Sequence, residues 1–217
     1  MGIDISTYPT IIFDCDGVIL DSNKVKSSAF HEVALAYGEE AADALVRYNS
    51  ENGGISRFRK FDYFLKSIVP AGTSGPGLDE LVKNFAAKVI ENLVNCQVAD
   101  GLQKLRQMAP DSRWMIVSGG AQSELNDVFK SRGLDALFDG GIFGNPDSKE
   151  TILLRERGNG NIVDPALFVG DSRYDHEVAV SNGMDFVFVS DWTEFTNWES
   201  YFDQETPVIG KIADLIQ

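Results

Sequence analysis

Three aspartates lie close together near the start of the chain, in the segment IIFDCDGVILDSN (residues 11–23). They follow a β-rich run at residues 10–13, although aspartate is rare in strands and common in turns. Carboxylates in this position can carry out chemistry. Asp14 can attack an electrophile and form a covalent intermediate. Asp16, two residues further on, can return over the same site as a general acid and then as a general base.

Further polar residues follow three later segments that have the pattern of buried strands. Ser118 ends the run RWMIVSGG, Lys149 follows the strand in FDGGIFG, and Asp171 ends ALFVGDS. Ligands of open parallel sheets bind beyond the carboxyl ends of the strands, so we expect these side chains to meet Asp14 there. Lys149, the Ser118 hydroxyl and the backbone N–H of Gly119 are then suited to binding the oxygens of a phosphoryl group.

The acidic residues of these segments also predict a metal. Asp171 and Asp175 add anionic oxygen beside Asp14 and Asp16. Clustered carboxylates repel one another unless a hard cation such as Mg²⁺ binds between them. We therefore expect a magnesium site formed by Asp14, Asp16, Asp171 and Asp175.

Each of these features also has a purely structural explanation. Asp14 and Asp16 are compatible with a turn, and Asp21 with Ser22 is better explained as the N-cap of a helix than as a catalyst. A lone lysine such as Lys149 is usually solvated. The functional interpretation rests on four elements in order, each at the end of a predicted strand.

The elements that position these residues alternate after residue 100. Strands at RWMIVSGG, GIFG, ALFVG and DFVFVS are separated by helical segments, and this alternation predicts an α/β fold with a doubly wound, Rossmann-like parallel sheet. Between the first strand and residue 100 the pattern is helical, with about four amphipathic segments. We therefore expect a core domain of residues 1–21 and 100–217 and an inserted α-helical cap of residues 22–99.

Composition narrows the function further. The chain has 217 residues, a net charge of -14 and 43% hydrophobic residues, which is ordinary for a globular protein. The acidic surface disfavours nucleic-acid binding, and no apolar stretch is long enough for a membrane span. Two cysteines far apart favour a reduced, cytoplasmic protein. We expect a monomer or a weak homodimer.

The motifs together resemble those of the haloacid dehalogenase-like (HAD) hydrolase superfamily. DCDGVILDS, VSGG, the lysine in GNPDSKE and GDSRYD stand in the order of its four motifs. The resemblance implies that Asp14 is a nucleophile that becomes an aspartyl-phosphate and that Asp16 is the acid/base. It also implies that Ser118 and Lys149 bind the phosphoryl group. The implied Mg²⁺ ligands are Asp14, the Asp16 carbonyl and Asp171, with Asp175 in support.

The resemblance also indicates a branch of the superfamily. Asp16 argues against the dehalogenases and phosphonatases, which replace the second aspartate. NGGISRFRKF (residues 52–61) resembles the cap loop of β-phosphoglucomutase-like members, in which an arginine grips a distal phosphate. Arg57 is the first candidate for that contact, with Ser56, Arg59 and Lys60 behind it. An amphipathic helix with solvated basic residues is the alternative. Lys26 stands where those mutases carry histidine, which favours hydrolysis, or it adds positive charge near the substrate.

These observations predict a Mg²⁺-dependent phosphatase of a small phosphorylated metabolite, such as a sugar phosphate or a phosphoglycolate-like acid. A sugar phosphomutase is the alternative enzyme, and a non-catalytic regulatory module is a third interpretation. The segment after residue 189 is rich in aromatic residues. We expect these residues to pack against the core, with a self-association surface as the alternative.

Overall fold

The computed structural model describes residues 3–216. Its centre is a six-stranded sheet in the order β3-β2-β1-β4-β5-β6, in which every neighbouring pair is parallel. The chain starts in the middle of the sheet and winds outward on both sides, so the predicted doubly wound α/β class is confirmed. The strands are β1 (Thr10–Phe13), β2 (Arg113–Ala121), β3 (Gly141–Asn145), β4 (Ala166–Gly170), β5 (Asp185–Val189) and β6 (Val208–Ile209).

Helices cover both faces of this sheet, because successive strand side chains point to opposite sides. They are α5 (Leu102–Met108), α6 (Gln122–Ser131), α7 (Lys149–Gly158) and α8 (Arg173–Ser181). Ile11 and Phe13 of β1 pack with apolar residues of α5 and α6, whereas Ile12 packs with those of α7 and α8. The sheet is therefore buried on both faces, and its polar chemistry is confined to the strand ends.

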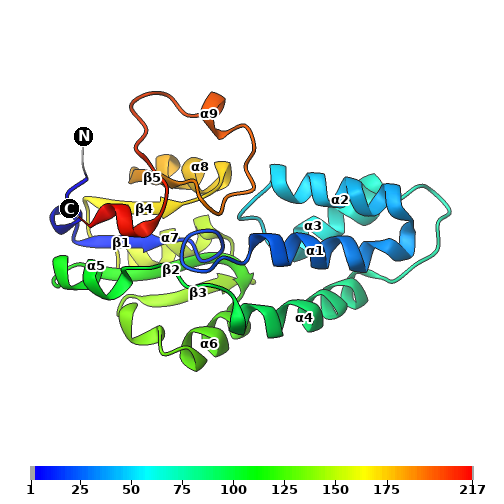
Figure 1. Ribbon diagram of the computed structural model, residues 1–217, viewed down its shortest axis with the longest axis horizontal. Helices are drawn as coiled ribbons and strands as arrows, with labels where there is room; N and C mark the ends of the chain where they lie inside the picture. The colour runs from blue at the N-terminus through cyan, green and yellow to red at the C-terminus, as the bar shows by residue number, and fades with distance from the viewer. Residues whose placement is uncertain (1–2, 217) are drawn as a thin grey trace.

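Four further helices are inserted between β1 and β2 and form a helical lobe beside the sheet (Figure 1). They are α1 (Asn23–Ala34), α2 (Glu39–Glu51), α3 (Arg57–Tyr63) and α4 (Leu78–Asn95). The rings of Phe30, Phe61 and Phe85 meet at its centre, with centroids 4.3 to 5.8 Å apart. A π-helical turn, Phe64–Ile68, extends α3. Residues 23–95 contain no strand, as the sequence predicted.

The two chain segments that join the helical lobe to the sheet run side by side. The N–H of Asp21 donates a hydrogen bond to the carbonyl of Gln97, and the N–H of Ala99 donates one to the carbonyl of Ile19, both at 2.9 Å. The lobe is therefore attached through one two-stranded connection rather than through two independent linkers.

The segment after β5 returns over the sheet and adds β6 and the short helix α9 (Trp198–Tyr201), which the sequence pattern did not reveal. Its aromatic rings pack against Phe188 of β5, with centroid distances of 6.4 Å to Phe195, 5.4 Å to Trp198 and 4.6 Å to Phe202. Packing against the core thus accounts for these three aromatic residues. Short 3₁₀ turns cover Ile5–Thr7, Leu35–Tyr37, Asp135–Leu137 and Ile212–Leu215.

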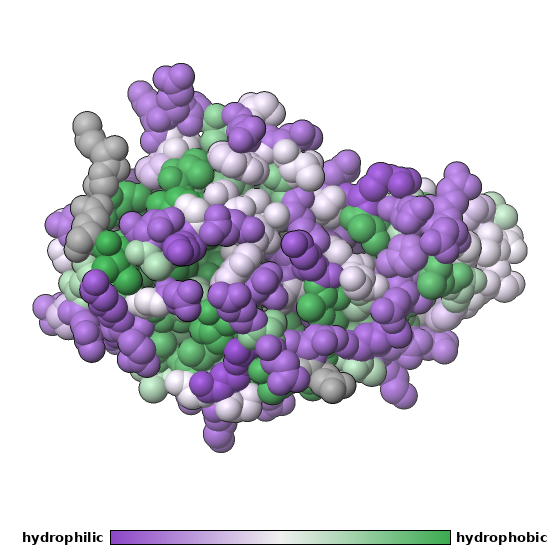
Figure 2. Space-filling view, in the orientation of Figure 1, coloured by the Kyte–Doolittle hydropathy of each residue, from purple (hydrophilic) through white to green (hydrophobic). Residues whose placement is uncertain are grey.

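The surface agrees with the composition. Figure 2 shows hydrophilic side chains over most of the visible face, with hydrophobic ones in smaller patches between them. Within residues 3–216, no helix is both long and apolar enough to cross a lipid bilayer.

Candidate active site

The carboxyl ends of three strands lie side by side at one edge of the sheet. Phe13, the last residue of β1, is in register with Ile116 of β2 and Val169 of β4. The chain runs on from these residues to Asp14, Ser118 and Asp171, so the parallel register brings distant parts of the sequence to one place. We call the buried side chains at this edge, Asp14, Lys149, Asp171 and Asp175, the floor of the site.

Lys149 is the centre of the floor. Its ammonium lies 2.8 Å from Oδ1 of Asp14 and 2.5 Å from Oδ1 of Asp175, and its side chain is 1% exposed. Burial alone would favour the neutral amine, but the charges of the two carboxylates raise the pKa of Lys149 well above its ordinary value. This lysine is therefore a fixed cation that orients the candidate nucleophile.

Asp175 is held on its other side by the start of α8. Its Oδ2 accepts hydrogen bonds from the backbone N–H of Ser172 at 3.1 Å and from the Ser172 hydroxyl at 2.6 Å. The Ser172 hydroxyl also accepts from the N–H of Asp175, which completes a capping box. Both carboxylate oxygens of Asp175 are thus engaged, and the residue positions Lys149 as well as adding charge.

The three floor carboxylates form a cluster that suits a divalent cation. One oxygen from each of Asp14, Asp171 and Asp175 lies within 4.8 Å of the others. Burial, opposed by the Lys149 ammonium and reinforced by Asp175 and Asp16, raises the pKa of Asp14 to about 7. Burial and the charges of Asp14 and Asp175 also raise the pKa of Asp171 well above its usual range. A bound cation would favour the charged forms of Asp14 and Asp171, so the donor set fits Mg²⁺.

The backbone at Gly17 is shaped by this cluster. Its φ is +77°, and a Cβ at this position would lie 2.1 Å from Oδ2 of Asp171 and 2.4 Å from Nδ2 of Asn23. The Asn23 amide in turn donates to Asp171 at 2.7 Å. Only glycine therefore allows the first loop to pass this close to the Asp171 carboxylate.

Asp16 faces the same cavity as Asp14 and is held from the helical lobe. Its Oδ2 lies 2.5 Å from the ammonium of Lys26, and its Oδ1 accepts a hydrogen bond of 2.5 Å from the Ser22 hydroxyl. Burial opposes the charged form, but Lys26 and these hydrogen bonds hold the pKa of Asp16 below its ordinary value. Lys26 thus contacts the candidate acid/base directly. Ser22 is the N-cap residue of α1, but its hydroxyl goes to Asp16 instead of capping the helix.

Ser118 and Gly119 lie where β2 leads toward α6. Ser118 is fully buried, and its hydroxyl accepts a hydrogen bond of 3.0 Å from the N–H of Gly120. Gly119 lines the cavity, and a Cβ on it would lie 2.3 Å from the carbonyl oxygen of Gly54 in the helical lobe. The absence of a side chain at Gly119 therefore lets the lobe meet the core.

A second close approach shows that the helical lobe lies directly on the strand ends. A Cβ on Gly53 would lie 2.9 Å from Cβ of Ser172, and one on Gly54 would lie 3.0 Å from the Tyr174 ring and 3.1 Å from the Ser172 hydroxyl. The loop between α2 and α3 thus covers the floor. We call the lobe residues that face the floor, Asn49, Gly53, Gly54, Arg57 and Lys60, the roof of the site.

Arg57 lies in the roof but is bound to the core. Its guanidinium forms a two-point ion pair with Glu124 of α6, with Nη1 2.9 Å from Oε1 and Nη2 bonded to Oε2, and it stacks over Phe85 at 4.8 Å. The side chains of Arg57 and Glu124 are 6% and 16% exposed. The arginine that the sequence singled out for a distal phosphate is therefore already neutralised.

Lys60 begins a chain of polar contacts across the roof. Its ammonium donates to Oδ1 of Asn49 at 2.6 Å, and Nδ2 of Asn49 donates to the Ser27 hydroxyl at 2.8 Å. The Ser27 hydroxyl donates to Glu194 at 2.5 Å. The loop after β5 also reaches the floor, because the Thr193 hydroxyl donates to the carbonyl of Asp171 at 2.5 Å.

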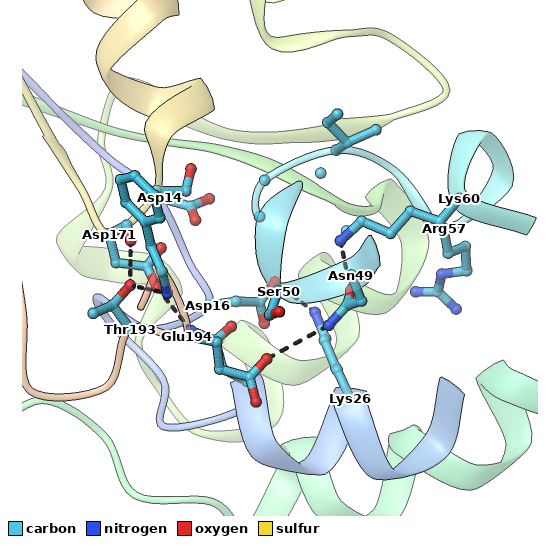
Figure 3. A pocket seen from close by; sticks show the side chains of 18 of the residues that line it. Asp14, Asp16, Lys26, Asn49, Ser50, Arg57, Lys60, Asp171, Thr193 and Glu194 are labelled. Atoms are coloured by element: carbon cyan, nitrogen blue, oxygen red, sulfur yellow. Dashed lines mark hydrogen bonds and ion pairs between the residues drawn. The ribbon is translucent and has the colours of Figure 1, made fainter. Parts of the chain in front are cut away.

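Floor and roof enclose a cavity of about 70 Å³ (Figure 3). In Figure 3, Asp14, Asp16 and Asp171 lie on one side of it, and Asn49, Arg57 and Lys60 on the other. Of the predicted substrate-binding residues, Arg57, Gly119 and Lys26 line this cavity. Ser56 lines a separate cavity on the other side of the Gly54 loop.

The order of these motifs along the chain matches that of a known protein family. A family model of haloacid dehalogenase-like hydrolases matches residues 8–183, most of the chain. The chain belongs to this family. None of the curated proteins matches the sequence closely enough to count as a relative.

Solved structures of similar shape come from the same group of proteins. A protein from Bacteroides fragilis assigned to the haloacid dehalogenase-like hydrolases has a TM-score of 0.73 and 21% identity, over 97% of this chain and 100% of its own. A protein from Lactobacillus plantarum provisionally named a phosphoglycolate phosphatase has a TM-score of 0.71 and 20% identity, over 94% of this chain and 96% of its own. β-Phosphoglucomutase from Clostridium difficile has a TM-score of 0.71 and 18% identity, over 97% and 94%. These identities show a shared fold.

The structure adds site residues to this haloacid dehalogenase-like hydrolase that sequence reasoning missed. Asn23, Asn49, Glu124, Thr193 and Glu194 all contact residues of the floor or the roof. Asn23 directly follows the first motif and was within reach of motif-based reasoning. The others carry no local signal, because their roles depend on how the helical lobe and the last loop pack against the core.

Proposed function

We propose that the chain is a Mg²⁺-dependent phosphatase that hydrolyses a small phosphorylated metabolite through an aspartyl-phosphate intermediate. The observation that carries this proposal is the position of Asp14. It is buried at the end of β1, oriented by Lys149, and faces the same cavity as Asp16. Membership of a hydrolase family and the likeness in fold to phosphatases support the proposal.

In the first step, an oxygen of Asp14 attacks phosphorus, and the bond from phosphorus to the leaving-group oxygen breaks as Asp16 donates a proton to that oxygen. In the second step, Asp16 takes a proton from water, the water oxygen attacks phosphorus, and the bond to Asp14 breaks. The proton on Asp16 then passes to the departing phosphate, so that both carboxylates are restored. Lys149 and Ser118 would contact the phosphoryl oxygens that do not react.

The protonation of Asp16 differs between these steps. Lys26 and Ser22 favour its ionised form, which is the form that a general base needs. The first step needs the protonated form. A phosphate monoester has a second pKa of about 6, so the monoanion of the substrate can deliver this proton. Lys26 is therefore proposed to position Asp16 and to set its charge.

Asp14, Asp171 and the backbone carbonyl of Asp16 are proposed to hold Mg²⁺, with Asp175 in support. When bound, the ion supplies positive charge to the transferring phosphoryl group. Gly17 and Asn23 keep the Asp171 carboxylate in place for it.

We propose that residues 22–99 act as a cap that closes over the substrate. The contacts of Gly53 and Gly54 with Ser172 and Gly119 support this role, because they shield the floor from water. Closure also limits the substrate to small molecules, in keeping with a cavity of about 70 Å³.

The experiment that tests this function measures free phosphate released from sugar phosphates, hydroxy-acid phosphates, nucleotides and an aryl phosphate, with Mg²⁺ and with EDTA. We expect Mg²⁺-dependent release from at least one class and a loss of at least a thousandfold in Asp14→Asn. Near-normal release by Asp14→Asn would contradict the mechanism. An isomerised phosphate ester in place of free phosphate, together with activation by a bisphosphate, would instead identify a phosphomutase.

A further inference from the structure

Four basic side chains stand in or directly beneath the cavity, and three of them have an acidic partner. Lys149 pairs with Asp14 and Asp175, Lys26 pairs with Asp16, and Arg57 pairs with Glu124. The fourth is Lys60, whose ammonium donates to the side-chain oxygen of Asn49. Among residues 3–216, no carboxylate lies within ion-pair distance of Lys60, so no direct ion pair neutralises its charge.

Lys60 is nevertheless buried and lines the cavity. It is 6% exposed, and its ammonium lies 5.5 Å from the centroid of the Phe30 ring. An ammonium has three N–H donors, and the structure gives this one a single hydrogen bond, to Asn49. The Phe30 ring face offers partial compensation for the charge.

The neighbours of Lys60 cannot turn to neutralise it. The amide orientation of Asn49 is fixed, because its Nδ2 donates to Ser27, whose hydroxyl is committed to Glu194. Burial, reinforced by the charge of Lys26, lowers the pKa of Lys60 to about 8, although Asp16, Glu194 and Asp171 act in the opposite direction. A buried cation without an anion is unfavourable, and a ligand that brings the anion removes this penalty.

The charge of the roof indicates which anion fits. Arg57, the other roof cation, is occupied by the carboxylate of Glu124. A second phosphoryl group, with a charge near -2, would meet the Lys60 ammonium and the carboxylates of Asp16 and Glu194. A carboxylate needs one positive charge and is small enough for a cavity of about 70 Å³.

We propose that the leaving group of the substrate carries a carboxylate that binds the ammonium of Lys60, so that the substrate is the phosphate ester of a small hydroxy acid. This inference rests on the proposed phosphatase function and assigns its substrate class. Phosphorus lies at the floor and the carboxylate at the roof. Lys60 is the residue that selects the substrate, whereas the chemistry of the floor does not depend on the carboxylate.

The test compares esters that differ only in this charge. Phosphoglycolate and phosphorylated 3-hydroxypropionate are each paired with their uncharged amide, so that two chain lengths are covered. We expect kcat/KM for the better acid to exceed that for its amide by at least tenfold, the effect of one charge-assisted contact. In Lys60→Met we expect this ratio to fall to within about twofold of one. The exposed Lys66→Met variant is the matched control and should keep the wild-type ratio.

The outcomes separate the inference from the function on which it rests. Equal turnover of acid and amide by the wild type would overturn the carboxylate assignment and leave the phosphatase intact. An unchanged ratio in Lys60→Met would overturn the role of Lys60. If phosphate is released from sugar phosphates or nucleotides but not from these esters, the carboxylate assignment fails and the phosphatase stands. If no ester of this set or of the wider panel releases phosphate, the proposed function fails. Calorimetric binding of the same pairs to Asp14→Asn and to Asp14→Asn with Lys60→Met then decides, since equal affinity for acid and amide contradicts the inference and a preference lost with Lys60 supports it.

Discussion

Two buried lysines, one in the floor and one in the roof, differ in their charged partners and in the direction in which their pKa is shifted. Lys149 is 1% exposed and lies between two carboxylates, which raise its pKa. Lys60 is 6% exposed and has a neutral amide as its acceptor, and its pKa is lowered to about 8. The charge of Lys149 is thus paired with carboxylates of the protein before any substrate binds, whereas Lys60 has no ion-pair partner among residues 3–216. Under the proposed function, the floor carries the reaction that all substrates share, and the roof selects the substrate.

Replacing each of the two lysines with methionine is the most direct test of this difference. In Lys149→Met, two buried carboxylates lose their cation, so we expect the free energy of unfolding to fall by about 3 to 5 kcal/mol, together with activity. In Lys60→Met, relief of the buried charge offsets the lost hydrogen bond to Asn49, and we expect a change below about 1 kcal/mol. Urea unfolding measures both values.

Lys66→Met is the control for this pair, because Lys66 is exposed and forms an ion pair with Asp62 on its own helical segment. A change of less than about 0.5 kcal/mol is expected there. If Lys149→Met were as mild as Lys66→Met, the floor would not be the tightly paired cluster described above.

Gly17→Ala tests the floor from the backbone. The new Cβ would lie 2.1 Å from Asp171 at a φ of +77°. We expect a loss of about 1 to 3 kcal/mol in unfolding free energy and a weaker dependence of phosphate release on Mg²⁺, since Asp171 must move. Gly133→Ala is the matched control. Its φ is +64°, but apart from its chain neighbours no atom of residues 3–216 lies within 4 Å of the new Cβ, so backbone strain is present without the displacement. Equal Mg²⁺ profiles in the two variants would contradict this account.

The pH dependence of stability tests the lowered pKa of Lys60 in the roof. The pKa of Lys60 is lower in the folded protein, about 8, than the usual 10.5 of lysine in the unfolded chain. Between these values the unfolded state binds more protons, so stability rises with pH and is lost as pH falls toward 8. We expect the stability of the wild type to gain about 1 kcal/mol relative to Lys60→Met between pH 8 and pH 9. Parallel curves in chemical denaturation would show that Lys60 keeps an ordinary pKa.

The smallest expected effect concerns Arg57. Glu124→Gln removes its counter-charge, and the freed guanidinium becomes available to a second phosphoryl group. We expect kcat/KM for a bisphosphate, relative to the corresponding monophosphate, to rise about threefold, which corresponds to less than about 1 kcal/mol. A ratio unchanged from the wild type would mean that Arg57 does not face the bound substrate.

The sequence predicted the floor far better than the roof, for a physical reason. Asp14 and Asp171 directly follow β1 and β4, and Ser118 lies in the last part of β2, so the parallel sheet brings them together whatever the loops do. β6 escaped notice because two residues carry no usable period.

The roof depends on tertiary packing that no local pattern reveals. Arg57 was predicted to bind substrate because of its motif, yet its partner Glu124 lies 67 residues away on another helix. Lys60 and Glu194 are connected through Asn49 and Ser27. These four residues come from four different segments of the chain. Such a network becomes visible only when the helical lobe is placed on the core.

The paired connection between Asp21 and Gln97 has a consequence for how such a protein can diversify. The chain leaves the core and returns to it at adjacent points, with 2.9 Å between the N–H nitrogen of Asp21 and the carbonyl oxygen of Gln97. Because the two ends of the insertion lie next to each other, the inserted segment does not have to bridge a distance across the core. Any module with neighbouring termini can be joined there. The sheet domain can therefore be inherited intact while the inserted helical module is exchanged, lengthened or shortened as a unit.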